Sequence, residues 1–155
     1  MANVYSQANI HAIFAVKGRE NLLTKNIREQ LFPYISGILK NHKIYPLAVN
    51  GWLDHVHIFF EMKPDIGISS TIELVKSNSS KWINKNKLVK GKFEWQRGYG
   101  AFSYSKSQRD TVIKYIMRQE EHHSQPANTF KAEYIKILQD FEIDYKNEYL
   151  FDFYD

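Results

Sequence analysis

The sequence predicts an α+β fold in which an antiparallel sheet carries helices on one face. Segments with strand-like and helical spacing of apolar residues follow one another as strand, helix, strand, strand, helix, strand, with two more helices after them. An Asn50-Gly51 pair between two of the strand-like segments is typical of an antiparallel hairpin. Two strand–helix–strand halves of this kind describe a ferredoxin-like sandwich.

The first half of the chain is expected to form a strand, a helix and a hairpin. Pro33 should kink the helix or mark the start of its main segment. The hairpin turn should lie at Asn50-Gly51, although Trp52-Leu53-Asp54 could widen it. The expected elements are a strand over Val4–Val16, a helix over Thr24–His42, and strands over Lys43–Val49 and His55–Met62.

The second half is expected to form a helix, two short strands and two further helices. Ser105 or Ser107 could cap the first helix after the strands, and Pro126 should end it. A lysine-rich stretch over residues 84–92 predicts an exposed loop. The expected elements are a helix from Ile68 to about Lys85, strands over Phe93–Gln96 and Tyr99–Tyr104, and helices over about Gln108–His123 and Thr129–Asp140.

The composition is that of a globular protein. The 155 residues are 43% hydrophobic, which is enough for a core, and we expect one domain over residues 1–155. The absence of cysteine excludes a disulfide scaffold, a cysteine nucleophile and a thiolate metal site. We expect neither a signal peptide nor a membrane span, because no apolar run is long enough, and we expect a cytoplasmic protein.

Charge is distributed unevenly along the chain. An acidic, aromatic tail over about residues 140–155 holds six acidic residues and one lysine. The remainder has 20 basic and 11 acidic residues, a net charge of +9, against +4 for the whole chain. A basic body of this kind suits a partner that bears phosphates.

Two histidines, His55 and His57, lie one residue apart in an apolar strand, so both should point to the same face of the sheet. One reading is a histidine that only hydrogen-bonds locally. The other is a metal site, since the strand places two imidazoles at same-face positions next to a core. Imidazole ligands favour Zn, Mn or Fe, whereas substrate phosphates and water would favour Mg²⁺ or Mn²⁺.

Tyr115 and Gln119 are four residues apart on an expected helix and should share a face. Tyr115 is one of ten tyrosines and could simply pack. Beside an open metal site, however, its phenol is a candidate nucleophile and Gln119 a candidate third ligand. A phenol leaves more readily than an aliphatic alcohol, so a phosphotyrosine link can be reversed by a DNA hydroxyl.

Several basic residues are candidate DNA contacts. The lysines of residues 76–92, with Trp82, Phe93 and Trp95 interleaved, could contact a DNA backbone and stacked bases, or form a solvated basic loop next to buried aromatics. Lys114 and Arg118 flank Tyr115 and Gln119 and could hold phosphates. His122 and His123 lie at the expected C-terminus of the helix that carries Tyr115, where partly charged imidazoles are placed favourably. The alternative is a role near the active site. The candidate contacts are Lys76, Lys81, Arg97, Lys106, Lys114 and Arg118.

Together these segments resemble the single-tyrosine HUH transposases of the insertion sequence 200/605 family, over essentially the whole chain. The segments that carry the resemblance are Leu53-Asp54-His55-Val56-His57-Ile58, the stretch Trp95–Ser103, the stretch Tyr115–His123, and the tail segments Tyr134–Leu138 and Tyr149–Asp152.

The resemblance implies an HUH endonuclease fold that acts on single-stranded DNA with hairpins. His55, His57 and Gln119 would bind Mg²⁺ or Mn²⁺, and Tyr115 would attack a DNA phosphate to give a 5′-phosphotyrosine and a free 3′-hydroxyl. It further implies a homodimer with composite active sites, associated with the nucleoid when on DNA.

Three other readings remain open. One is a domesticated relative that acts on repeated genomic hairpins. Another is a non-catalytic nucleic-acid-binding regulator of the same fold. The third is a small metabolic or sensor protein, which predicts negligible affinity for hairpin DNA at moderate salt.

Overall fold

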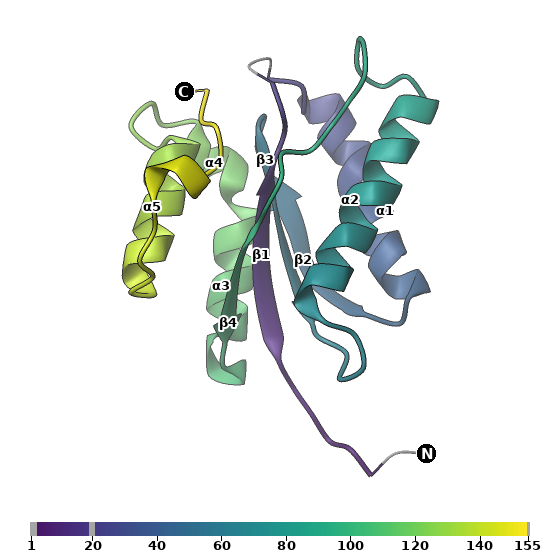
Figure 1. The fold of residues 1–155 in the computed structure, drawn as a ribbon, viewed down its shortest axis with the longest axis vertical. Coiled ribbons are helices and arrows are strands. Elements are labelled where there is room, and N and C mark those ends of the chain that lie inside the picture. The colour runs from purple at the N-terminus through teal and green to yellow at the C-terminus, as the bar shows by residue number, and fades with distance from the viewer. Residues whose placement is uncertain (1–2, 19–20, 155) are drawn as a thin grey trace.

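The computed structural model describes residues 3–18 and 21–154 (Figure 1). Within them, one antiparallel sheet has the strand order β2-β3-β1-β4, with α1 between β1 and β2 and α2 between β3 and β4. This is the ferredoxin-like arrangement that the sequence predicts. The elements are β1 (Asn9–Ala15), α1 (Lys25–Asn41), β2 (Tyr45–Gly51), β3 (His55–Glu61), α2 (Ile68–Lys85), β4 (Gly100–Tyr104), η1 (Lys106–Gln108), α3 (Arg109–Met117), α4 (Gln119–His123), α5 (Phe130–Asp140) and η2 (Asn147–Tyr149).

The two faces of the sheet are covered by different helices (Figure 1). α1 and α2 pack on one face, as expected for the two crossover helices, and bury Ile10, Ala12 and Phe14 of β1. α3, α4 and α5 lie against the opposite face, which Ile13 and Ala15 of β1 help to form. Helices therefore cover both faces of the sheet and not the single face expected from the sequence, because the strands bury apolar side chains on both sides. Because side chains alternate along a strand, each strand serves both layers.

β1 is shorter than the sequence pattern suggests. It begins at Asn9, whereas residues 3–8 form no strand and Tyr5 is 99% exposed. Strand-like spacing continues through these residues, but no neighbouring strand pairs with them, and pairing is what makes a strand. The N-terminal segment therefore extends away from the body of the molecule (Figure 1).

The β2–β3 turn is wider than two residues. β2 ends at Gly51, β3 begins at His55, and the amide of Trp52 donates to the carbonyl of His55 at 3.0 Å. A Cβ on Gly51 would lie 2.2 Å from that carbonyl oxygen, so the turn requires glycine there. The widened alternative is the one that forms.

Two expected elements differ from the structure. Phe93–Gln96 is not a strand of the sheet; it makes a single bridge, Trp95 to Val16, before β4 begins at Gly100. The helix expected over Gln108–His123 is interrupted at Arg118, which separates α3 from α4. At this break the side-chain amide of Asn50 donates to the carbonyl of Ile116 at 2.8 Å, a tertiary contact that helical spacing does not reveal.

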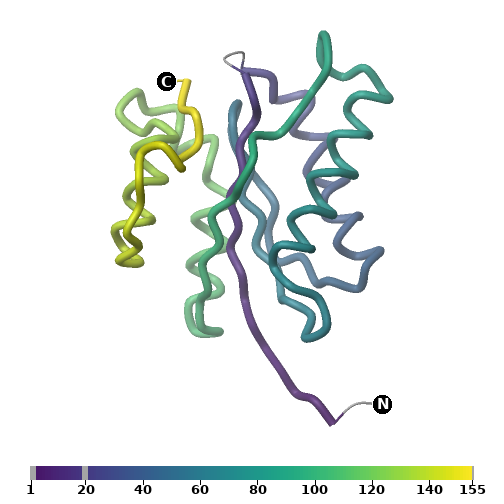
Figure 2. Tube along the Cα trace, in the orientation of Figure 1, coloured from purple at the N-terminus to yellow at the C-terminus, as the bar shows by residue number. Residues whose placement is uncertain are grey.

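The acidic tail packs against α5 through its aromatic residues. Phe151 and Phe153 contact Phe130 and Tyr134 of α5, and the tail runs beside that helix (Figure 2). The buried amide of Gln96 fixes the tail backbone: it donates to the carbonyl of Asp152 and accepts from its amide, at 2.9 and 2.8 Å. In the described part of the chain, no helix is long and apolar enough to cross a bilayer.

Candidate active site

β3 places two imidazoles on the face of the sheet that α3, α4 and α5 cover. His55 and His57 are both fully buried there, as their i, i+2 spacing predicts. His55 is stacked on Phe130 of α5, with ring centroids 3.9 Å apart and planes within 4°. The apolar neighbours of β3, such as Ile58, point into the other layer.

Each of three imidazoles is held at Nδ1 by a different group. Nδ1 of His55 lies 2.7 Å from Oδ1 of Asp54, and Nδ1 of His57 lies 2.7 Å from Nε2 of His11 on β1. Nδ1 of His123, on α4, lies 2.6 Å from the carbonyl oxygen of Asn128. With Nδ1 engaged, each ring presents Nε2 to the interior.

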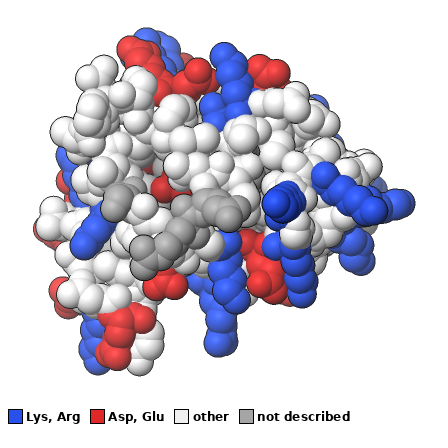
Figure 3. Space-filling model, turned by 90° about the horizontal axis from the view of Figure 1, so that it is seen from above, with Lys and Arg blue, Asp and Glu red and all other residues white. Residues whose placement is uncertain are grey.

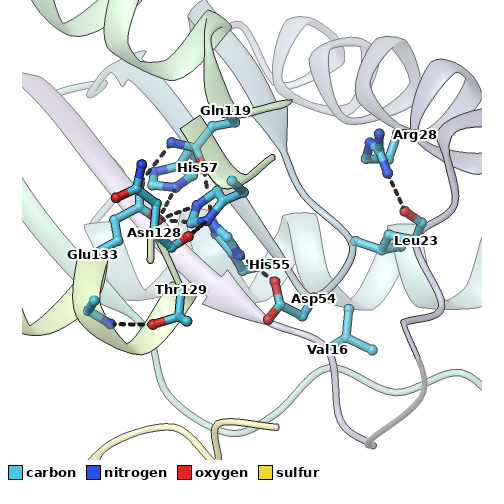
Figure 4. Close-up of polar contacts among 12 residues, drawn as sticks. Val16, Leu23, Arg28, Asp54, His55, His57, Gln119, Asn128, Thr129 and Glu133 are labelled. Atoms are coloured by element: carbon cyan, nitrogen blue, oxygen red, sulfur yellow. Dashed lines mark hydrogen bonds and ion pairs between the residues drawn. The ribbon is translucent and has the colours of Figure 1, made fainter. Parts of the chain in front are cut away.

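These Nε2 atoms converge on the carboxylate of Glu133, which α5 carries into the site (Figure 4). Oε1 of Glu133 lies 3.0 Å from Nε2 of His123, 3.1 Å from that of His55 and 3.3 Å from that of His57. Glu133 is 6% exposed, so this carboxylate is buried and compensated by imidazoles.

The second oxygen of Glu133 holds Tyr115 and Gln119. The Tyr115 hydroxyl donates to Oε2, and Nε2 of Gln119 donates to the same oxygen at 2.8 Å. Oε1 of Gln119 in turn lies 3.0 Å from Nε2 of His55. Tyr115 and Gln119 thus meet the histidines as expected, although they lie on two helices and not on one.

The charges in this cluster shift its acid–base behaviour. Burial alone would lower the pKa of His55, but hydrogen bonds to Asp54 and Glu133 raise that pKa to about 9. Burial alone would raise the pKa of Glu133, but His57, His123 and His55 hold that pKa well below its usual range. Without a metal, the cluster is therefore an ion pair of carboxylate and imidazolium.

The neighbouring groups are kept neutral. Burial lowers the pKa of His57, and burial together with His57 lowers the pKa of His11 well below its usual value. Burial and the adjacent Glu133 raise the pKa of Tyr115, so its hydroxyl keeps its proton in this arrangement.

The donor set fits a divalent cation. Metal-bound histidines commonly have their other ring nitrogen held by a carboxylate or a carbonyl, and His55 and His123 are held in that way, whereas His57 is held by the imidazole of His11. Among the described residues, His55, His57 and Glu133 offer ligand atoms within 4.8 Å of one another, as do His122, His123 and Glu133. Two imidazoles, one amide oxygen and one carboxylate suit Mn²⁺ or a similar ion.

The candidate DNA contacts fall into separate places. Lys114 and Arg118 line a groove of about 570 Å³ beside Tyr115, together with His122. Lys81 and Arg97 line a second groove of about 610 Å³ between α2 and residues 92–98. Lys106 is exposed on η1 and lies in neither groove.

Lys76 is the exception among these lysines, because its charge is already engaged. Its ammonium donates to the carbonyls of Gln96 and Gly98 at 2.9 and 2.6 Å. Burial lowers its pKa. It therefore fixes the turn before β4.

Sequence reasoning missed Glu133 and His11 and gave His123 only an alternative role. Glu133 lies 76 positions after His57, and His11 lies 46 before it. A signal for Glu133 was available: it is an acidic residue followed by Tyr134 on the buried side of an amphipathic helix. A buried carboxylate normally needs a partner, so its place in that pattern was informative.

Comparison with known proteins bears on the family and the fold of the chain. The family model for IS200-like transposases matches residues 4–119. No curated protein sequence matches the chain.

Two solved structures share the fold. One is a Deinococcus radiodurans R1 protein assigned as a transposase, 20% identical with a TM-score of 0.62, over 77% of this chain and 95% of that one. The other is a REP-associated tyrosine transposase bound to a REP hairpin, 15% identical with a TM-score of 0.58, over 98% and 91%.

The matched region runs from before β1 to the end of the Tyr115–Gln119 segment and includes both histidines of β3. It covers well over half of the sequence, and the sheet order is that of an α+β ferredoxin-like fold. The chain belongs to the IS200-like transposase family.

Proposed function

We propose that this protein cuts and rejoins single-stranded DNA next to hairpins through a covalent link to Tyr115. One observation carries the proposal: in a chain of the transposase family, the Tyr115 hydroxyl and the two β3 imidazoles meet around one buried carboxylate. The likeness in fold to a tyrosine transposase bound to a hairpin supports a hairpin substrate.

The reaction transfers a phosphoryl group to tyrosine and back. The phenolic oxygen of Tyr115 attacks a backbone phosphorus, and the bond from phosphorus to the 3′-oxygen breaks. The departing oxygen takes up a proton, so that a 5′-phosphotyrosine and a free 3′-hydroxyl result. Oε2 of Glu133 already accepts a hydrogen bond from Tyr115 and is placed to take its proton. A DNA 3′-hydroxyl then reverses the step, because the phenol is a good leaving group.

His55, His57 and Gln119 would hold the divalent ion, Mg²⁺ or Mn²⁺, whose charge would polarise the scissile phosphate and stabilise the departing oxygen. The protein contributes orientation: Asp54 and His11 fix the two rings, and burial excludes water from them. The same fixed rings would keep the phosphate aligned with Tyr115.

DNA would enter along the groove beside Tyr115, where Lys114 and Arg118 can contact phosphates. Lys81 and Arg97 line the second groove and could hold another part of the strand. Figure 3 shows basic side chains projecting from several places on one face, interspersed with acidic ones. Recognition would thus depend on separate basic grooves, with Lys106 as a further outlying contact.

The assembly and location follow the same proposal. We propose a cytoplasmic protein that is nucleoid-associated when on DNA, formed by one domain and acting as a homodimer. In the structure Tyr115 reaches the histidines of its own chain, and in a composite site it would reach those of its partner.

Mixing a Tyr115→Phe chain with a His55→Ala chain distinguishes the two arrangements. Restored strand cleavage requires sites built from two chains. No restoration means that each site is completed within one subunit, as the single chain is arranged here.

The proposal is tested with end-labelled single-stranded hairpin DNA from the flanks of the gene, with and without Mn²⁺. We expect cleavage that depends on the metal and leaves a free 3′-hydroxyl. Binding without cleavage over several flanking sequences would favour a non-catalytic nucleic-acid-binding regulator. Transposon ends that flank the gene in the genome would distinguish a mobile element from a domesticated relative.

A further inference from the structure

Two side chains in the site lie beyond the part of the chain that the family model matches. The match ends at residue 119, whereas His123 is near the end of α4 and Glu133 is in the first turn of α5. Both are buried, at 8% and 6% exposure. They extend the site past the two β3 imidazoles and the amide of Gln119.

The geometry around Oε1 of Glu133 is that of ligands gathered about one point. Three imidazole nitrogens from β3 and α4 lie 3.0–3.3 Å from this oxygen. Each of these rings is also fixed at its far nitrogen, by Asp54, His11 or the carbonyl of Asn128. A mere ion pair needs one imidazole partner; three oriented rings are the arrangement of a metal site.

We propose that Glu133, through Oε1, and His123, through Nε2, are further protein ligands of the divalent metal in this chain. The inference rests on the proposed function, since it concerns the same ion. It makes the site one of three imidazoles and a carboxylate, with the amide of Gln119 beside them.

His123 is preferred over its neighbour His122 on geometry. His123 is held by Asn128 and its Nε2 faces Glu133, whereas His122 is partly exposed and lines the outer groove beside Tyr115. His122 is close to Glu133 as well, which makes it the matched test of this choice.

The surroundings hold α5 firmly against the sheet. Phe130 stacks on His55, and Tyr134 packs over Gly100, where a Cβ would lie 2.5 Å from the Tyr134 hydroxyl. Glu133 lies between these two anchors. Its carboxylate is thus positioned by the fold, as a ligand must be, and is not free to leave the site.

This ligand set predicts the choice of metal and its link to the nucleophile. Imidazole-rich sites bind Mn²⁺, Co²⁺ or Zn²⁺ more tightly than Mg²⁺, which prefers oxygen ligands and keeps its water. Oε2 of Glu133 would still face the Tyr115 hydroxyl, so one carboxylate would join the ion to the attacking group.

Metal binding by the full chain, stripped of metal and free of DNA, tests the inference. Mn²⁺ affinity is measured by calorimetry and Co²⁺ binding by visible absorption, for the wild type, Glu133→Gln and His123→Gln. Glu121→Gln and His122→Gln are the matched controls. We expect one ion per chain, with Mn²⁺ affinity lowered more than ~10-fold in the first two variants and unchanged in the controls.

Circular dichroism and melting of the metal-free variants establish that they are folded. If Glu133→Gln unfolds, Glu133→Asp, which keeps the charge but shortens the reach, takes its place and should also weaken binding. Folded variants that bind Mn²⁺ as tightly as the wild type would overturn the inference while leaving the proposed cleavage intact. A wild type that cleaves DNA with Mg²⁺ yet binds no Mn²⁺ or Co²⁺ would overturn it too. Loss of all cleavage in the wild type would instead count against the proposed function.

Discussion

The two faces of the sheet differ in the polarity of the side chains that they bury. Beneath α1 and α2 the strands present apolar side chains such as Phe14, Ile58 and Phe60, each 0% exposed. Beneath α3–α5 the same strands present His11, His55 and His57 at 0–1% exposure. One face is a hydrophobic core; the other combines apolar side chains such as Ile13 and Phe59 with a buried polar network.

Because of this difference, stability and function depend mainly on different faces of the sheet. Burial of apolar surface stabilises the fold at about 25 cal/mol per Å². Buried imidazoles and a carboxylate cost desolvation energy that only good pairing offsets. Substitutions at adjacent residues of β3 should therefore lower mainly activity on one face and mainly stability on the other. Variants along that strand can test this division.

The largest effect is expected for His57→Ala on the polar face. Loss of this imidazole should lower DNA cleavage by roughly 10³-fold or more, since a catalytic metal supplies several kcal/mol of charge stabilisation. The protein should stay folded. Single-turnover cleavage assays with Mn²⁺ measure the effect, and near-normal cleavage would remove His57 from the reaction.

Its neighbour Ile58 should behave in the reverse way. Ile58→Ala removes a fully buried side chain from the apolar face and should lower the free energy of unfolding by about 2–5 kcal/mol. Cleavage per folded molecule should be nearly unchanged. Denaturant unfolding provides the measurement, with Val4→Ala, at a position 58% exposed, as the control that should cost little.

A smaller effect is expected for Gln96, whose side chain fixes the backbone of the C-terminal tail. Gln96→Leu removes the hydrogen bonds to Val16 and Asp152, at 2.8–2.9 Å, and should cost about 1–3 kcal/mol. The tail should then be cut more readily by a protease, because its aromatic residues pack less firmly on α5. Unchanged proteolysis of the tail would show that the aromatic contacts suffice without the amide.

The smallest effect is a pH dependence that belongs to the polar face. Burial and His57 lower the pKa of His11 well below 6.5, so as pH falls through about 6.5 the unfolded chain binds a proton that the folded chain does not. The metal-free protein should lose stability from pH 7 to pH 5, and His11→Phe should lose less. Melting temperatures at the two pH values test this, and equal losses in both proteins would contradict it.

The sequence pattern was sufficient for what depends on local periodicity. The i, i+2 histidines of β3 and the helical spacing in α1 and α2 identify elements and faces within a few residues. The break at Arg118 and the start of β1 depend on tertiary partners, which the pattern of one segment does not contain.

The candidate site shows the same limit. His55, His57, Tyr115 and Gln119 could be grouped because each pair is close in sequence. Glu133 and His11 reach them only through the packing of α5 and the pairing of β1 with β3. Their roles become visible when the chain is folded.

The most direct test of the central claim is to locate the phosphate on the protein. Incubation with single-stranded hairpin DNA and Mn²⁺, nuclease trimming and mass spectrometry of peptides should place a nucleotide-linked phosphate on Tyr115. Tyr115→Phe should bind the hairpin and form no adduct. An adduct on another tyrosine, or one that persists in Tyr115→Phe, would contradict the assignment of Tyr115 as the nucleophile.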